Sequence, residues 1–211
     1  KDKIIMGGRT SSWRMIRTKK DLHYYLECDR VALGLKGSLR DWILSYTWRY
    51  QRALRKYEYY HNRYGASPMN LMMFYHYFRT RRLGRICGYQ IHRNVFGPGL
   101  SIAHLGTIIV NSQARVGRNC RLHNLVHIAT LPHAGMEQKA PTIGDDVFIG
   151  AGAVIVGDIT IASGIAIGAN SYVDRSFLEE GIVIAGSPAK KVSNRHEQFW
   201  IRATDIVDGK K

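Results

Sequence analysis

The sequence contains no long hydrophobic run. No stretch reaches the roughly 18 uninterrupted apolar residues of a membrane-spanning helix, and the longest apolar-aromatic run, Met69 to Phe78, is interrupted by His76. Cysteine is also scarce. The three cysteines, Cys28, Cys87 and Cys120, are widely spaced and form no CxxC motif. The first absence excludes a transmembrane helix, and the cysteine pattern suits the reduced thiols of a cytoplasmic protein better than a disulfide framework or a zinc site.

Negative charge is scarce in the first half of the chain. Residues 1–95 hold 20 Lys and Arg against 6 Asp and Glu, whereas residues 96–211 hold 11 against 10. A chain of 211 residues is long enough for one domain of ordinary size or two small ones. The uneven charge therefore predicts two regions with different roles, the first of them facing an anionic neighbour.

The first region is expected to be helical. Thr18-Lys-Lys-Asp21 and Ser38-Leu-Arg-Asp41 resemble capping boxes, in which a hydroxyl and a carboxylate satisfy the first backbone amides of a helix. After the second box, an apolar stripe from Trp42 to Tyr57 predicts one long helix. Ser67-Pro68 has the residue types of the first positions of a third helix, which we expect to run to about Arg82.

The second region has a six-residue period. A helix repeats every 3.6 residues and a strand every two, so a step of six fits neither. A hexapeptide repeat fits it, since three short parallel strands per coil stack into a triangular prism with aliphatic residues pointing inward. The ten matching positions are Val110, Val116, Leu122, Ile128, Ile143, Ile149, Ile155, Ile161, Ile167 and Val173.

Two irregularities interrupt this period. The step from Ile102 to Val110 is eight residues, and His104 lies in the excess. The step from Ile128 to Ile143 is fifteen, so residues 130–139, which include His133, are predicted to form a polar loop outside the prism. Functional sites tend to lie on such irregular segments of a regular scaffold.

Four segments together resemble a known family. They are Gly97–Asn111, Pro141-Thr-Ile-Gly-Asp-Asp-Val-Phe-Ile-Gly-Ala-Gly-Ala-Val154, Ile167-Gly-Ala-Asn-Ser171 and Ala185-Gly-Ser-Pro-Ala-Lys-Lys191. They resemble the left-handed β-helix acyltransferases, and most of all serine acetyltransferase and its relatives that O-acetylate sugars of surface polysaccharides.

The resemblance implies a mainly β fold, a left-handed parallel β-helix with an N-terminal α-helical domain. The expected boundaries are 1–88 for the basic helical domain, 89–192 for the β-helix and 193–211 for a C-terminal tail. The resemblance further implies a homotrimer or a dimer of trimers, with acetyl-CoA as co-substrate lying between adjacent prisms.

The resemblance also assigns site residues. His104 takes the position of the catalytic histidine. Ala151 and Ala169 take the corner positions whose backbone meets the pantetheine arm, and Arg175 and Lys190 lie where basic residues approach the phosphates of coenzyme A. A histidine suits the role of general base because its ordinary pKa is close to 7.

Several residues depart from the pattern of serine acetyltransferases. The acidic residue expected before the catalytic histidine is Ala103, a second active-site histidine is replaced by Ala140, and the aspartate partner of the catalytic histidine would fall near Tyr89. Asp29 is the candidate for a substrate-binding aspartate in the helical domain. These departures favour an acceptor bulkier than serine.

Other histidines offer alternatives to this assignment. His133 could be a rival base or bind substrate from its loop. His104, His123, His127 and His133 could instead converge on a metal ion, as in carbonic anhydrases built on the same prism. The acetyl-transfer hypothesis requires no metal.

The aromatic and basic residues of the helices favour a solvated or membrane-facing surface over a nucleic-acid-binding site. No nucleic-acid motif is present, and a simple solvated face is the plainest interpretation. The functional hypothesis is attraction to an anionic membrane surface, or to a pyrophosphate-linked acceptor resting on it. It rests on Met69, Met72, Met73, Phe74, Tyr77 and Phe78 beside Arg79, Arg81, Arg82 and Arg85.

The sequence thus predicts a cytoplasmic enzyme, peripheral at the inner face of the membrane in the surface hypothesis. It would transfer an acetyl group from acetyl-CoA to the hydroxyl of a sugar in surface polysaccharide synthesis. The alternative enzyme is a serine O-acetyltransferase of cysteine biosynthesis, and the non-enzymatic alternative is a scaffold that binds no acetyl-CoA.

Overall fold

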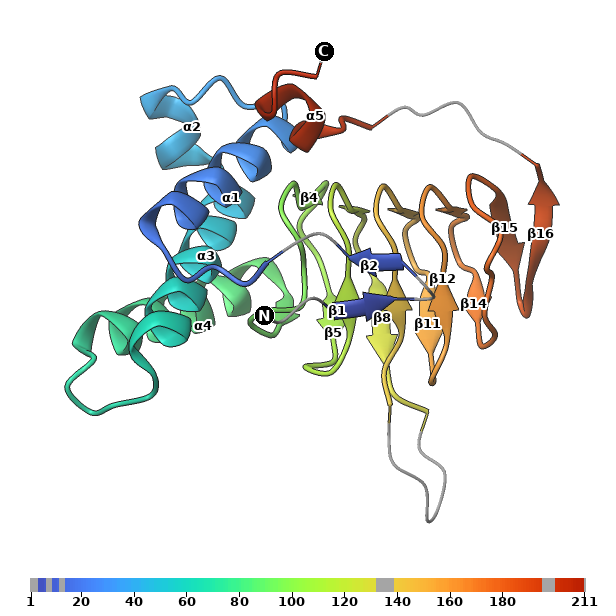
Figure 1. The fold of residues 1–211 in the computed structure, drawn as a ribbon, viewed down its shortest axis with the longest axis horizontal. Coiled ribbons are helices and arrows are strands. Elements are labelled where there is room, and N and C mark those ends of the chain that lie inside the picture. Colours follow the sequence, from blue (N-terminus) through green and yellow to red (C-terminus); the bar gives the residue numbers. More distant parts are fainter. Residues whose placement is uncertain (1–3, 7–8, 12–13, 132–138, 195–199, 211) are drawn as a thin grey trace.

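Helices precede a coil of short parallel strands in this protein (Figure 1). The structure is a computed structural model that describes residues 4–6, 9–11, 14–131, 139–194 and 200–210. A short antiparallel pair comes first, β1 (Ile4–Met6) with β2 (Arg9–Ser11). The helices are α1 (Lys19–Ala32), α2 (Leu39–Leu44), α3 (Tyr46–Tyr64), α4 (Leu71–Cys87) and, near the end of the chain, α5 (Ala203–Val207).

Three parallel sheets make up the coil. One contains β4 (Ser101–Ile102), β7 (Arg121–Leu122), β10 (Phe148–Ile149), β13 (Ala166–Ile167) and β15 (Val183–Gly186), with β16 (Ala189–Ser193) added antiparallel at its end. A second contains β3 (Tyr89–Ile91), β5 (Ile108–Val110), β8 (Val126–Ala129), β11 (Val154–Val156) and β14 (Tyr172–Val173). The third contains β6 (Arg115–Val116), β9 (Thr142–Ile143) and β12 (Thr160–Ile161). From β4 to β14, successive strands lie in the three sheets in turn, which confirms a parallel-sheet fold with N-terminal helices.

The interior of the prism is aliphatic. All ten residues of the six-residue period are at most 1% exposed, so the prediction that they point inward is confirmed. Neighbouring coils are in register, for example Leu122 beside Ile149 and Ile149 beside Ile167. Each such side chain contributes about 1.5–3 kcal/mol by leaving water.

Two predictions about the helices were confirmed and two were wrong. Thr18 and Ser38 do form capping boxes, with Asp21 and Asp41 respectively. The expected long second helix is broken at Ser45, whose side chain caps α3 by accepting from the Trp48 amide. Before this break, Trp42 and Ile43 are each 48% exposed, so the apolar stripe does not begin there.

The third helix also differs from its prediction. It begins at Leu71 rather than at Ser67-Pro68, because the Asn70 side chain accepts from the Met73 amide and caps it. It continues past Arg82 and ends at Gly88, which adopts the left-handed conformation that glycine allows.

A buried ionic cluster joins the helices to the first coil. Arg55 of α3 is fully buried and pairs with Asp29 of α1 at 2.8 Å and with Glu58 at 3.1 Å. Its guanidinium also donates to the carbonyl oxygens of Phe96 and Gly97 at 2.9 and 2.7 Å. The cluster therefore fixes α1 and α3 against the start of the prism.

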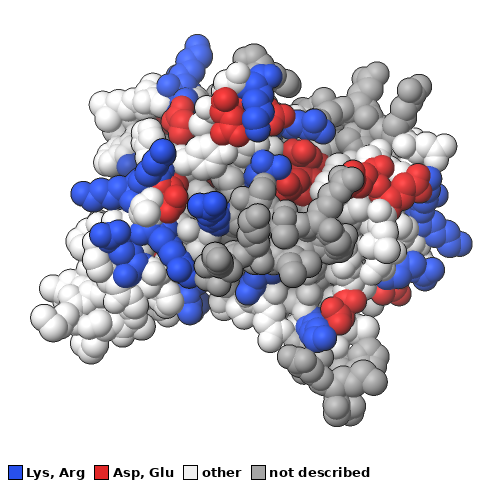
Figure 2. All heavy atoms as spheres, viewed as in Figure 1, with Lys and Arg blue, Asp and Glu red and all other residues white. Residues whose placement is uncertain are grey.

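The described end of the chain returns to the helices. The side-chain oxygen of Asn119 accepts from the Thr204 amide at 3.1 Å, and Ala203 of α5 packs with Cys28 and Ala32 of α1. Lys and Arg side chains gather over the helical region on the face drawn in Figure 2, as the composition of that region predicts.

Among the residues that the structure describes, no helix combines the length and the apolar character needed to cross a membrane.

Candidate active site

His104 lies in the turn between β4 and β5, and its side chain is exposed. The turn is held from both sides: the Ala103 amide donates to the Leu122 carbonyl at 2.9 Å, and the Gly106 amide donates to the Cys87 carbonyl at 3.0 Å. The enlarged step in the repeat therefore builds a projecting but anchored turn that presents an imidazole to solvent.

Tyr89 holds the backbone of this turn by a hydrogen bond. Its hydroxyl donates to the His104 carbonyl oxygen at 2.9 Å and lies 3.3 Å from the Thr47 hydroxyl, while its ring packs against Tyr50 at 5.0 Å. The position where the resemblance implies an aspartate beside the histidine is thus occupied by a residue that holds the backbone of His104. The sequence had located this position but had given Tyr89 no role.

A second histidine lies on the next coil. The rings of His104 and His123 have centroids 5.4 Å apart in an edge-to-face arrangement, and Phe148 packs on the far side of His123 at 5.1 Å. Burial, Arg121 and His104 all lower the pKa of His123 below its ordinary value of 6.5. His123 is therefore a neutral imidazole beside the candidate base near pH 7.

One edge of the prism carries His104 and the two predicted corner alanines. Because Ile102, Leu122, Ile149 and Ile167 are in register, the residues two positions after each of them stack in a column. That column, here called the His104 edge, consists of His104, Asn124, Ala151 and Ala169. The structure therefore brings together three of the residues that the resemblance assigned to one site.

Backbone donors are available along the His104 edge. Within the described part of the chain, neither the Ala151 amide nor the Ala169 amide donates a hydrogen bond to a backbone carbonyl. A Cβ on Gly150 would lie only 2.7 Å from the Ala169 nitrogen, so this close stacking requires glycine. The edge can thus offer donors to an extended ligand.

The two basic residues predicted to contact coenzyme A, Lys190 and Arg175, lie on different edges of the prism. Lys190 on β16 lies opposite Ala185, which follows the inward residue of the last coil, so it is close to the end of the His104 edge. Arg175 follows β14 and forms an exposed contact with Asp174 at 3.4 Å. It lies at the corner after the second sheet, a different edge of the prism from that of His104.

Asp29 does not face a ligand. It is fully buried, and its carboxylate accepts from Arg55 and from the amides of Gly99 and Leu100, both at 2.9 Å. We therefore assign it a structural role in place of the substrate contact that the resemblance implied. The sequence gave no signal for Arg55 as its partner.

The metal hypothesis called for histidines that converge on one point. The described residues contain no group of three His, Cys, Asp or Glu side chains placed to hold a metal ion. His127 lies in the middle of β8, away from the His104 edge, and His133 lies outside the described residues.

Comparison with known proteins supports the hexapeptide repeat and the fold. Residues 140–175 match the family model described as bacterial transferase hexapeptide (six repeats). The serine acetyltransferase of Neisseria gonorrhoeae is 26% identical, with 85% of this chain and 71% of that chain covered and a TM-score of 0.64. The serine acetyltransferase of Brucella abortus strain S19, solved in complex with coenzyme A, is 23% identical over 84% of this chain and 70% of that one, with a TM-score of 0.66. Soybean serine acetyltransferase complexed with serine is 23% identical over 82% and 70%, with a TM-score of 0.63.

Proposed function

We propose that this chain, which matches the hexapeptide transferase model and resembles serine acetyltransferases, is an O-acyltransferase that transfers an acetyl group from acetyl-CoA to a hydroxyl with His104 as general base. The observation that carries the proposal is the His104 edge, where an exposed imidazole lines up with two unbonded backbone amides. We also infer that the coil is left-handed, as the resemblance implies.

The donor is proposed to lie along the His104 edge. A pantetheine arm carries amides of its own, and the free amides of Ala151 and Ala169 are suited to hydrogen-bond it. Lys190 at the end of the edge would meet the phosphates. The coenzyme A complex of the Brucella relative supports this donor, and the resemblance supports a homotrimer or a dimer of trimers with the donor between prisms.

The reaction then needs one proton shuttle. The His104 imidazole takes the proton of the acceptor hydroxyl while that oxygen attacks the thioester carbonyl. The C–S bond breaks from the tetrahedral intermediate, whose oxyanion a backbone N–H stabilises, and the imidazolium returns the proton to the leaving thiolate. The products are the acetyl ester and coenzyme A, and no covalent bond to the enzyme forms.

L-serine is the acceptor that the comparisons favour, since the similar solved structures are serine acetyltransferases. A sugar hydroxyl is the second candidate, and it rests on a specific observation. Serine would bring an ammonium group that needs a carboxylate, but the two positions where an acid is expected hold Ala103 and Tyr89. Asp29 is buried and already paired.

Mass spectrometry of the products tests this proposal. The protein would be incubated with acetyl-CoA and either L-serine or a panel of oligosaccharides and nucleotide sugars. O-acetylserine would establish the first acceptor, and an acetylated sugar with inert serine would establish the second. Failure to bind acetyl-CoA, measured by calorimetry on the same sample, would contradict the proposed donor and leave the scaffold interpretation.

A further inference from the structure

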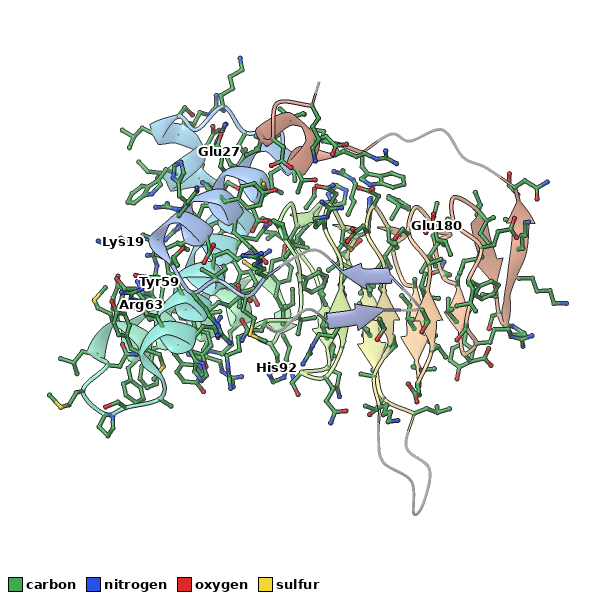
Figure 3. All side chains as sticks on the ribbon, in the orientation of Figure 1. Lys19, Glu27, Tyr59, Arg63, His92 and Glu180 are labelled. Carbon is green, nitrogen blue, oxygen red and sulfur yellow. The ribbon has the colours of Figure 1, made fainter. Side chains whose placement is uncertain are left out.

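A cleft opens where the helices meet the first coil, and Tyr89, which supports the His104 turn, is among the residues that line it. It has a volume of about 510 Å³ and is walled by α3, α4, β3 and the segment that leads into β5. This volume is in the range of small-molecule sites. His92, labelled in Figure 3, lies in this cleft at the junction between the helices and the prism.

Three arginines line the cleft. Arg81 and Arg85 come from α4 and Arg93 follows β3, and none of the three has an ion pair among the residues that the structure describes. No Asp or Glu side chain of the described chain lines the cleft. Arg93 makes only a long contact, 3.4 Å, with the Tyr57 hydroxyl.

The charge of the cleft acts on its own histidine. Burial, Arg93 and Arg81 together lower the pKa of His92 below 6.5. A positive potential of this kind is relieved by an anion, and arginine forks match the oxygen geometry of a phosphate. Beside the arginines, the rings of Tyr57 and Tyr77 have centroids 5.5 Å apart and form an uncharged wall.

The position of the cleft distinguishes it from the donor site. The donor is proposed to run from His104 along Ala151 and Ala169 toward Lys190, at the far end of the prism from the helices. The cleft begins at the opposite end and shares Tyr89 and the turn residue Thr107 with the His104 side. His104 does not line the cleft itself, so a ligand in it would reach the imidazole by extending past Thr107.

We propose that this cleft binds a phosphate-bearing acceptor, with its phosphates on Arg81, Arg85 and Arg93 and an uncharged ring against the tyrosines. The identification of the ligand as the acceptor rests on the proposed acetyl transfer, whereas the binding of an anion does not. The shared chemistry is a phosphate or diphosphate ester, carried either by a nucleotide sugar or by a diphosphate-linked lipid.

Calorimetry with a double variant tests anion binding. R81Q/R85Q removes two charges of the cleft, and R82Q removes an exposed charge of the same helix that does not line it. The probes are inorganic pyrophosphate, UDP, UDP-glucose and a diphosphate lipid in detergent micelles. We expect the double variant to bind the anionic probes about tenfold or more weakly, R82Q to bind them within about twofold of the wild type, and affinity for coenzyme A to stay unchanged.

Each other outcome is decisive. Equal losses of affinity for the anionic probes in R82Q and in the double variant would mean that the positive charge of the helix attracts anions without a specific site, and would overturn the proposal. Displacement of UDP by coenzyme A would also overturn it, because the two ligands would then share one site. Tighter binding of UDP-glucose than of the lipid would assign the nucleotide as the carrier of the phosphate, and the reverse order would assign the lipid.

Kinetics separates this proposal from the proposed function. If the double variant raises KM for a phosphorylated acceptor and leaves KM for acetyl-CoA and kcat unchanged, both stand. Serine acetylation at the wild-type rate by the double variant would keep the proposed function and overturn the cleft as an acceptor site. Specific anion binding without any acetyl transfer would keep the cleft and contradict the function.

Discussion

The helical region and the prism are stabilised in different ways. The prism interior is a column of aliphatic side chains held by coil-to-coil backbone hydrogen bonds, and it needs no specific side-chain partner. The helices share this apolar core through Tyr50, Leu54 and Leu83. They add buried polar contacts to the prism: Arg55, which also pairs with Asp29 and Glu58, donates to the Phe96 and Gly97 carbonyls, and Gln51 donates to the Leu100 carbonyl at 2.7 Å. The prism therefore supplies a regular frame, and the directional contacts of the helices fix where the first turn, with His104, lies.

The largest expected effect on stability is at the ionic cluster. R55M should destabilise the protein by about 3–5 kcal/mol, because Asp29 and Glu58 would remain buried without the cation that compensates their charge. Urea unfolding measures the change, and R63M, an exposed site on the same helix, is the matched control. Equal stability of the two variants would show that the helices do not depend on this cluster.

A cavity in the prism should lower the free energy of unfolding by a similar or smaller amount, through lost apolar contacts rather than through unpaired charge. I149A removes a fully buried side chain between two coils and should cost about 2–5 kcal/mol. V154A on the outer side of β11 should cost less, since its side chain is only half-buried. If the two variants unfold at the same urea concentration, the inward assignment of the period fails.

The pH dependence of stability should come mainly from the helices. His76 is buried and stacks on Tyr60 at 5.5 Å, and burial with the nearby Lys56 and Arg79 lowers its pKa from 6.5 to about 4. Between these two pH values the unfolded chain binds a proton that the folded chain does not, so the free energy of unfolding falls as pH falls, by up to about 3 kcal/mol.

The variant H76F isolates this contribution. Phenylalanine keeps the stacked ring and cannot titrate, so unfolding curves between pH 7.5 and 4.5 should be less steep in pH for H76F than for the wild type. Parallel pH profiles of the two proteins would show that His76 is not the titrating group.

The smallest effect is expected at Tyr89, where the two regions meet. Y89F removes the hydrogen bond to the His104 carbonyl and should cost about 1 kcal/mol of stability. If Tyr89 positions the turn, kcat should fall several-fold with KM for acetyl-CoA unchanged. A loss of stability without any change in kcat would limit Tyr89 to a structural role.

The same comparison explains what the sequence predicted. The prism could be located residue by residue because its period is local and repeats in every coil, and the enlarged step around His104 stood out against it. The capping boxes were equally local. The break at Ser45 was not predicted, since the apolar residues Trp42 and Ile43 continue the helical spacing although the tertiary structure leaves them exposed.

The contacts between regions could not be predicted in the same way. Asp29 is 26 residues from Arg55 and about 70 from Gly99, and no spacing rule connects them. The sequence assigned Arg81 and Arg85 to a membrane-facing surface and gave Arg93 no role, because a helical pattern alone does not tell which arginines line a cavity. The resemblance assigned both Arg175 and Lys190 to the phosphates of coenzyme A, and the position of Arg175 on another edge of the prism could not be foreseen from the sequence.

The central claim is that His104 on its edge of the prism is the base for acetyl transfer. The most direct test is acetyl-CoA turnover by H104Q beside H127Q, a half-buried histidine of the same prism that is off this edge. We expect H104Q to remain folded and to lose about 10²–10⁴-fold in kcat, while H127Q retains the wild-type rate. Wild-type turnover by folded H104Q would contradict the account.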